Sequence, residues 1–401
     1  MRKYCLLILF LFNTNLTYAR SFQVMSYNVE NLFDAIHDIE NDGENNIDNK
    51  KNKDKKDWSF LPRNAVGKKE ACNMEKNKRH QKECYDSDWT DDKIELKINQ
   101  IKEVVTQQNT TLPDFLGLVE VENKNIASRL AKKLGYEKFE ISSSPDERGI
   151  DVVLMYKNSK YIKMISRAEH IVPVDYATRN ILEVNFLIDN KFPLTIFVNH
   201  WPSLANPDSW RIKSAEVLAS RTLDILKKNN QMNILSMGDF NTVDENDPHP
   251  FQTVLFKDNL YKDVESAYRE GQLTSGILKK MTASGSYYFA PKKKWNWLDH
   301  FFVNKNLMDG HGLEVSFKTF EVYSPTFLTH RLLQKKRIGE DKSIEIVLAP
   351  KHFNPKANTK DEMGYSDHFA ILVKLELPQI VGPKKGKSKI NIKKQTKDKG
   401  F

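Results

Sequence analysis

Short apolar runs recur along the chain between polar segments. Each run is only a few residues long, which is typical of buried strands and too short for a membrane-spanning helix. The runs cover residues 22–28, 115–119, 150–156, 181–188, 194–199, 232–237, 297–303 and 369–375. We therefore predict a strand at each of these places.

Helical spacing of apolar residues occurs in three further segments. In the first, apolar residues follow one another at intervals of four, three and four, which indicates an amphipathic helix. They are Ile94, Ile98, Ile101 and Val105. The other two predicted helices cover residues 125–134 and 212–225. Helices alternate with strands early in the chain and strands dominate later, which favours sheets inside and helices outside.

The first residues have the pattern of a secretory leader. Arg2 and Lys3 precede an apolar core at 4–12, and Thr17-Tyr18-Ala19 offers a cleavage site with small residues. We predict a signal peptide at 1–19 and a periplasmic or extracellular mature protein. No later stretch approaches the roughly 20 apolar residues of a membrane helix, so no transmembrane segment is expected.

Removal of the predicted leader would leave two of the three cysteines in the chain. Cys5 lies inside it, which leaves Cys72 and Cys84 in the mature chain. In an oxidising compartment these two are expected to form one disulfide that closes a short loop. Metal binding with His80 is the weaker alternative, because the chain has no CxxC spacing.

Positive charge is concentrated at the end of the chain. The formal charge is +9, and residues 384–399 alone hold eight lysines and one aspartate. Such a segment has too few large apolar residues to bury a core, so we predict a disordered basic tail at 381–401. It could hold a polyanion loosely, or it could serve only solubility.

Residues 20–380 are predicted to form one domain with a polar insertion. No Pro-, Gly- or Ser-rich linker divides them, and no internal repeat is present. Residues 38–92 are dense in Asn, Lys, Asp and Glu, which indicates a long surface excursion. Trp58, Phe60 and Leu61 are its candidate anchors to the body.

One strand end carries a distinctive polar pair. After the run at 232–237, Gly238 permits a sharp turn or a close approach. Asp239 and Asn241 are two residues apart, so in extended geometry their side chains point the same way. They could form a site for a metal-bound water or a phosphate, although Asp and Asn also favour ordinary turns.

Comparable polar residues accompany the other predicted strands. The segments are Ser26-Tyr27-Asn28-Val29-Glu30-Asn31, Leu118-Val119-Glu120-Val121-Glu122-Asn123, Arg148-Gly149-Ile150-Asp151, Asn199-His200-Trp201-Pro202-Ser203, Leu298-Asp299-His300 and Ser366-Asp367-His368. This ordered set, from about residue 22 to 377, resembles the motif series of the endonuclease/exonuclease/phosphatase family. The likeness is closest to its secreted bacterial branch.

The resemblance implies a fold and a reaction. The fold class is α/β, a four-layered α/β/β/α sandwich of two mixed sheets flanked by helices, with the site at one rim. Family members include pancreatic-type deoxyribonucleases, abasic-site endonucleases, sphingomyelinases and inositol-phosphate phosphatases. The implied reaction is metal-dependent hydrolysis of a phosphoester.

The resemblance also assigns metal and phosphate ligands. Glu120 is similar to the family's principal metal carboxylate, with Asn28 beside it and Asp367 as a second carboxylate. Oxygen ligands suit Mg²⁺ or Mn²⁺, and Ca²⁺ is a further candidate. Arg179 is similar to the arginine that the deoxyribonuclease-like branch places on phosphate. Arg148 is a second candidate for that task.

Catalytic roles follow from the same resemblance. Asp239 is expected to orient or deprotonate the attacking water, and Asn241 to hold a phosphate oxygen. His368 is expected to pair with the scissile phosphate, its ring held by Asp299. His200 is similar to the second histidine of the deoxyribonuclease-like branch, near the leaving oxygen. Glu30 and Glu122 are read as loop carboxylates, and His300 as structural.

We predict an exported metal-dependent phosphodiesterase, a monomer whose substrate is a nucleic acid with DNA favoured over RNA. A sphingomyelinase-like phospholipid phosphodiesterase or a phosphatase is the alternative. No aromatic hairpin of the membrane-inserting kind is evident in the sequence, which argues against a lipid substrate. A non-catalytic polyanion-binding protein is the alternative of another class. Endonucleolytic and exonucleolytic cleavage both stay open, as does the role of the insertion.

Overall fold

The structure is a computed structural model, and it describes residues 18–38, 55–107, 112–275, 283–338, 341–357 and 359–378. The predicted basic tail and residues 1–17 of the predicted leader lie outside the described residues. The first strand begins at Tyr18, so the last two residues of the predicted leader are part of it. Among the described helices, none combines the length and apolar character needed to cross a bilayer.

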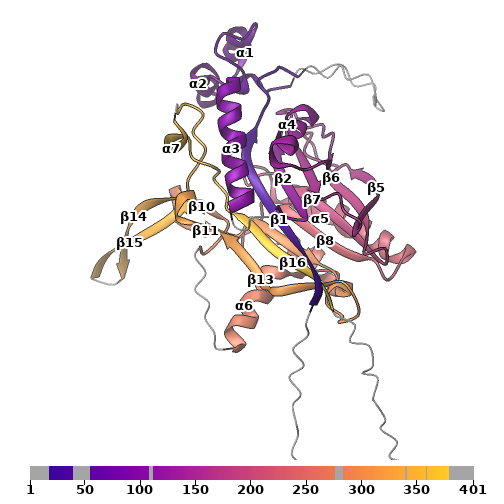
Figure 1. Cartoon of the computed structure of the whole chain (residues 1–401). Coiled ribbons are helices and arrows are strands. Elements are labelled where there is room, and N and C mark those ends of the chain that lie inside the picture. The colour runs from indigo at the N-terminus through magenta and orange to yellow at the C-terminus, as the bar shows by residue number, and fades with distance from the viewer. Residues whose placement is uncertain are drawn as a thin grey trace, which may run out of the picture.

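A six-stranded sheet forms around the first strand (Figure 1). Its order is β13 (Glu314–Tyr323), β16 (Ala370–Pro378), β1 (Tyr18–Leu32), β2 (Phe115–Val121), β4 (Asp151–Tyr156) and β3 (Lys138–Ile141). Only β1 and β2 pair in parallel, and every other neighbouring pair is antiparallel. The sheet is therefore mixed.

A second six-stranded sheet repeats this arrangement. Its order is β5 (Ile162–His170), β6 (Ile181–Ile188), β7 (Phe192–His200), β8 (Asn233–Asp239), β12 (Asp299–Val303) and β9 (Lys262–Asp263). Again one pair, β7 and β8, is parallel and the rest are antiparallel. Each sheet thus contains a single parallel pair.

Both faces of the central strands are buried, because each strand lies between the other sheet and a helix. On β7, Ile196 and Val198 join the core between the sheets, whereas Phe197 joins a separate cluster with Leu218 of α5 (Asp208–Lys228). Burial on both faces explains why these strands appear in the sequence as continuous apolar runs. The predicted four-layered α/β/β/α sandwich is confirmed.

The three predicted helices are present. They are α3 (Asp91–Gln107), α4 (Lys124–Leu134) and α5. Ile94, Ile98 and Ile101 of α3 are buried in the core, as their spacing predicts. In α4 the side chain of Asn123 caps the first turn, and Gly135 ends the helix in a left-handed conformation.

Two short helices in the predicted insertion were not anticipated. They are α1 (Lys68–Met74) and α2 (Lys78–Asp86), which lie at the top of the molecule in Figure 1. A disulfide joins Cys72 to Cys84 with their Cα atoms 5.6 Å apart, which confirms the expected bridge. Phe60 anchors the segment by stacking on Phe33, with ring centroids 3.7 Å apart. This segment buries little aliphatic surface of its own, so its helical periodicity was weak.

The remaining elements are short or lie at the edges. The structure also contains η1 (Trp58–Phe60), η2 (Phe251–Leu255), η3 (Lys257–Asn259), α6 (Val264–Ser275), β10 (Tyr287–Phe289), η4 (Ala290–Lys292), β11 (Lys294–Asn296), η5 (Lys305–Leu307), η6 (Thr326–Leu328), β14 (Thr329–Ile338), β15 (Asp341–Pro350) and α7 (Lys360–Met363). Strands β14 and β15 form a separate two-stranded sheet, which projects from the body in Figure 1.

The topology brings many strand ends to one edge. Parallel strands end on the same side, so β1 and β2 finish together, as do β7 and β8. Strand β12 is antiparallel to β8, with Asp299 opposite Asp239, and therefore begins where β8 ends. Strand β16 is antiparallel to β1 and begins where β1 carries its polar residues. The predicted site residues thus meet at one rim.

Gly238 allows β7 and β8 to stay paired up to this rim. Its φ is +131°, and a Cβ atom at this position would collide with the carbonyl oxygen of Asn199. Only glycine tolerates both the backbone angle and the contact. The pairing continues through Asn199 opposite Gly238 to His200 opposite Asp239.

Replacing Gly238 with alanine should therefore destabilise the fold. We expect Gly238→Ala to lower the free energy of unfolding by about 3 kcal/mol or more, because it combines a strained φ with a backbone clash. The matched control is Gly271→Ala on α6, where an added Cβ meets nothing within 4 Å. Alanine there should raise stability by roughly 0.5–1 kcal/mol. Urea unfolding measures both, and equal stabilities of the two variants would contradict the prediction.

Candidate active site

A cleft of about 890 Å³ opens at the rim where the strand ends meet. Nine of the ten site residues predicted from the sequence line it, although they come from segments far apart in the chain. They are Asn28, Glu120, Arg148, Arg179, His200, Asp239, Asn241, Asp367 and His368. The tenth, Asp299, is fully buried behind His368.

Asp239 lies at the centre of this group. Its Oδ2 accepts a hydrogen bond of 3.1 Å from the Asn28 side chain, and its Oδ1 accepts one of 2.8 Å from the Asn241 backbone. The Nε2 atoms of His200 and His368 each lie 3.8 Å from Oδ2. Burial raises the pKa of Asp239 to about 7, with a further contribution from Asp299, while His368 acts in the opposite direction. Its carboxyl group is thus poised to exchange a proton near neutral pH.

His368 is held by a buried carboxylate. Its Nδ1 lies 2.6 Å from Oδ2 of Asp299, and both residues are buried. Burial by itself lowers the pKa of His368, but the carboxylates of Asp299, Asp367 and Asp239 outweigh it and raise the pKa well above the ordinary value. The ring is therefore a fixed cation that lines the cleft, with Nε2 at 3.8 Å from Asp239 and 3.9 Å from Asp367.

His200 has the opposite electrostatic character. Burial lowers its pKa well below the ordinary value, and the nearby Arg179 and Arg148 lower it further. Its Nε2 lies 3.8 Å from a carboxylate oxygen of Glu120, and its Nδ1 is buried without a hydrogen-bond partner among the described residues. A cationic and a neutral histidine therefore both lie 3.8 Å from the same oxygen of Asp239, an arrangement that can separate acid from base roles.

The backbone of Trp201 orients two polar side chains that line the cleft, Arg179 and Asn241. Its indole packs against Phe240 and its amide donates to the Asp239 carbonyl, which fixes the loop after β7. The Trp201 carbonyl then accepts hydrogen bonds from Arg179, at 2.6 Å, and from the Asn241 side chain, at 3.1 Å. The motif that contains His200 thus also supplies Trp201, which positions Arg179 and Asn241.

The guanidinium groups of the two candidate arginines differ in burial and in how many described residues hold them. Arg179 is buried, and its guanidinium also contacts Asp146 at 3.3 Å. Arg148 is exposed at the cleft, and no hydrogen bond or ion pair ties its guanidinium to another described residue. Arg148 can therefore move onto an incoming anion, whereas Arg179 offers a fixed positive charge.

The predicted metal ligands offer only oxygen donors. Glu120 adopts a left-handed φ of +65° at the end of β2, and its carboxylate lines the cleft. The Asn28 amide is oriented by its bond to Asp239 and by the Glu30 backbone amide, which donates to its oxygen. Together with Asp367, this is a hard donor set that fits Mg²⁺, Mn²⁺ or Ca²⁺.

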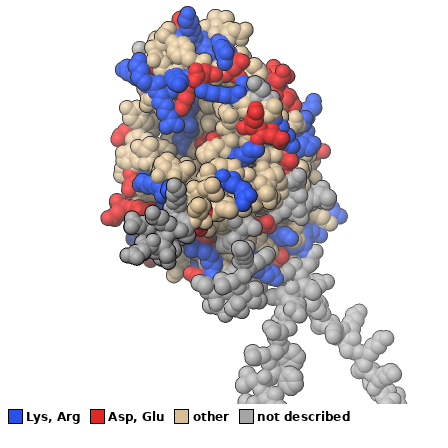
Figure 2. All heavy atoms as spheres, turned by 90° about the vertical axis from the view of Figure 1, so that its left-hand side faces the viewer, with Lys and Arg blue, Asp and Glu red and all other residues tan. Residues whose placement is uncertain are grey.

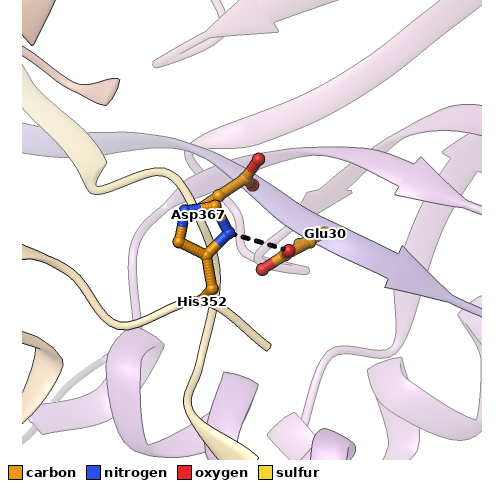
Figure 3. A group of neighbouring side chains, drawn as sticks. All are labelled: Glu30, His352 and Asp367. Carbon is orange, nitrogen blue, oxygen red and sulfur yellow. Dashed lines mark hydrogen bonds and ion pairs between the residues drawn. The ribbon is translucent and has the colours of Figure 1, made fainter. Parts of the chain in front are cut away.

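Asp367 also belongs to a second group of ligand atoms (Figure 3). Glu30, His352 and Asp367 each place one such atom within 4.8 Å of the others. Nδ1 of His352 lies 3.3 Å from Glu30, whose other oxygen accepts the Phe353 backbone amide. Burial and the Glu30 charge raise the pKa of Asp367 to about 6.

His352 was missed from the sequence because no motif surrounds it, and Glu30 was read as a loop carboxylate. Residues of the cleft wall were missed as well. Tyr287 of β10 lines the cleft, and its ring centroid lies 5.0 Å from that of His368. Trp295 of β11 packs against Phe369, next to His368. His300 is structural, because it packs between Phe251 and Phe302 and pairs with Asp263.

Solved structures share this architecture. An endonuclease/exonuclease/phosphatase family protein from Bacteroides thetaiotaomicron superposes with a TM-score of 0.50 at 14% identity, covering 90% of this chain and 96% of that one. The catalytic domain of human Nocturnin with bound sulfate gives 0.46 at 13% identity, covering 90% and 97%. A mannosyl-6-phosphatase from Bacteroides thetaiotaomicron gives 0.47 at 14% identity, covering 88% and 99%.

Sequence comparison assigns the family. No curated protein sequence matches the chain. The model of the Endonuclease/Exonuclease/phosphatase family, in contrast, matches residues 73–377, which include most of the sheet strands and nearly all of the cleft residues. Members of this family hydrolyse phosphoesters and generally depend on a divalent metal. Fold, cleft and family model agree, and the chain therefore belongs to the endonuclease/exonuclease/phosphatase family.

Proposed function

We propose that this protein is an exported, metal-dependent phosphodiesterase that cleaves nucleic acid, with DNA favoured. One observation carries the proposal: one oxygen of a buried carboxylate, Asp239, lies 3.8 Å both from the cationic His368, which Asp299 holds, and from the neutral His200. Binding a polyanion needs none of these carboxylates, because each repels a phosphate. Hydrolysis needs such groups to activate water and to balance charge.

The proposed metal site comprises Asn28, Glu120 and Asp367. A divalent cation there would supply Lewis-acid stabilisation of charge on the phosphate oxygens. These residues offer oxygen donors at the cleft surface, which is the donor chemistry that Mg²⁺ and Mn²⁺ prefer.

The remaining residues have separate tasks in the proposed reaction. Asp239 orients a water molecule and accepts its proton as the water attacks phosphorus in line with the leaving oxygen. His368, kept cationic by Asp299, donates a hydrogen bond to a non-bridging phosphate oxygen. Asn241 and the two arginines bind phosphate oxygens. The P–O bond to the leaving oxygen, which His200 faces, breaks as the bond from water forms, and the leaving oxygen takes up a proton from solvent. No covalent intermediate with the protein is formed.

The preference for nucleic acid rests on His200 and Arg179, which resemble the deoxyribonuclease-like branch. Figure 2 shows Lys and Arg interspersed with Asp and Glu at the top of the molecule, so surface charge on this face does not by itself select a polyanion. The proposed domain comprises residues 20–380, following a leader at 1–19, and the protein acts as a monomer. The basic tail would add weak, salt-sensitive affinity for long polyanions.

Metal removal tests the assigned ligands. EDTA should abolish cleavage of supercoiled plasmid, and excess Mg²⁺ or Mn²⁺ should restore it, because Glu120 and its neighbours lose their cation. Glu120→Gln should need a higher Mg²⁺ concentration for half-maximal rate. Undiminished cleavage in excess chelator would remove Glu120 from its assigned role.

Two substitutions test the roles proposed for Asp239 and His368. Asp239→Asn and His368→Ala should each reduce the plasmid-nicking rate by at least ~10²-fold, the lower range for loss of a positioned acid or base. The double variant should lose much less than the product of the two effects, because both residues serve one step.

Matched controls keep this test interpretable. Asp258→Asn changes an exposed aspartate with a left-handed φ that asparagine tolerates, and His311→Ala changes an exposed histidine. Both controls should nick plasmid at the parent rate, and circular dichroism should show all variants folded. A folded Asp239→Asn protein with the parent rate would overturn the mechanism.

A substrate panel separates the nuclease from its alternatives. The purified protein with Mg²⁺ is incubated with plasmid, RNA, sphingomyelin and a sugar phosphate, each with and without EDTA. We expect the fastest turnover on plasmid. Turnover of sphingomyelin or the sugar phosphate alone would favour the lipid phosphodiesterase or phosphatase alternative, and no turnover at all would favour a binding protein.

A further inference from the structure

The hairpin β14–β15 has one buried and one exposed apolar face. On the buried face, Leu332 and Val347 pair across the strands and pack with Tyr288 of β10. On the other face, Leu333 and Ile346 pair with each other and are 73% and 48% exposed. Exposed aliphatic side chains on both strands therefore form a continuous patch.

Two more aliphatic residues extend this patch along β15. Ile344 is 66% exposed and Leu348 is 41% exposed, on the same side as Ile346 because residues two apart share a face of a strand. Leu348 pairs with Arg331, which is also exposed. We call Leu333, Ile344, Ile346 and Leu348 the aliphatic patch.

Positive charge accompanies the aliphatic patch. Arg331 lies at one end of it, beside Leu348. In the sequence, β14 continues past the patch with Lys335, Lys336 and Arg337. The turn and the start of β15 hold Glu340, Asp341 and Lys342, so the stretch as a whole is net positive. The hairpin also stands clear of the two-sheet body in Figure 1, and Figure 2 looks onto the side from which it projects. A flat surface could therefore reach it without meeting the body first.

The size and chemistry of the patch select its partner. It spans two strands and about five residues, roughly 10 Å by 15 Å. A stable protein interface needs ~800 Å² on each side, so neither a second copy nor another folded protein would be held by this patch. Proteins bind single-stranded nucleic acid through aromatic side chains that stack on the bases, and the aliphatic patch contains no aromatic side chain. Aliphatic side chains beside cations instead match the boundary between acyl chains and anionic headgroups.

We propose that the aliphatic patch of β14–β15 docks the protein on a lipid bilayer that carries anionic phospholipids. Leu333, Ile344, Ile346 and Leu348 enter the headgroup boundary, and Arg331 contacts lipid phosphate. The buried face of the hairpin packs on β10, whose Tyr287 lines the cleft, so docking holds the active cleft beside the membrane surface. This attachment is independent of which phosphodiester is cleaved.

Vesicle co-sedimentation of the full chain tests the proposal. We expect binding to vesicles of phosphatidylglycerol and phosphatidylcholine, and at least ~10-fold weaker binding to phosphatidylcholine alone. The variant Leu333→Ser/Ile346→Ser should lose at least ~10-fold in partitioning to the anionic vesicles. Arg331→Glu should bind these vesicles more weakly than the parent chain, and its binding should depend less steeply on salt concentration. Plasmid nicking in solution should be unchanged in both, which separates this test from that of the active site.

The matched control removes equally exposed aliphatic residues elsewhere. Ile165 on β5 and Leu223 on α5 are 55% and 56% exposed, and Ile165→Ser/Leu223→Ser should partition like the parent chain. Equal partitioning by the two double variants would overturn the proposal. So would a hairpin variant that loses DNA affinity but keeps vesicle binding, or one that converts a dimer to a monomer in sedimentation equilibrium.

Discussion

The active rim depends on the close approach of two backbones at Gly238. Since this residue has no side chain, β7 and β8 remain in parallel register until His200 lies opposite Asp239. A bulkier residue would separate the strands one position before His200 and Asp239, which lie opposite each other. The same approach fixes Trp201, whose carbonyl orients Arg179 and Asn241. One backbone contact thus positions residues on both sides of the cleft.

The two histidines of the site differ in protonation because different charged groups surround them. His368 has a buried carboxylate on its Nδ1 and is cationic, whereas His200 has no such partner among the described residues and lies near two arginines. Identical side chains therefore acquire different protonation states from their surroundings alone. Asp239, between them, has a pKa raised to about 7 by burial. This division of roles is what connects the geometry to hydrolysis rather than to binding.

The cleft and the projecting hairpin are parts of one structural unit. Strand β10 contributes Tyr287 to the cleft and Tyr288 to the cluster under β14–β15. Two residues beyond β15, His352 contacts Glu30, which lies near the end of β1. An attachment through the hairpin would therefore act directly on the walls of the cleft.

Local sequence determined eight of the strands and three helices, because burial on two faces leaves apolar runs and helical burial leaves regular spacing. The cleft residues followed from the ordered polar motifs beside these strands and their resemblance to a family. The two predicted site residues Asn28 and Asp239 are 211 residues apart in the chain, and only the order and register of the strands bring them into contact. Helices α1 and α2 depend on a disulfide and a few aromatic anchors, and their own periodicity is weak. His352 is 322 residues from Glu30, so no local pattern could reveal their pairing. The exposed face of β14–β15 was likewise decided by packing, since an alternating apolar strand does not say which of its faces a neighbour will cover.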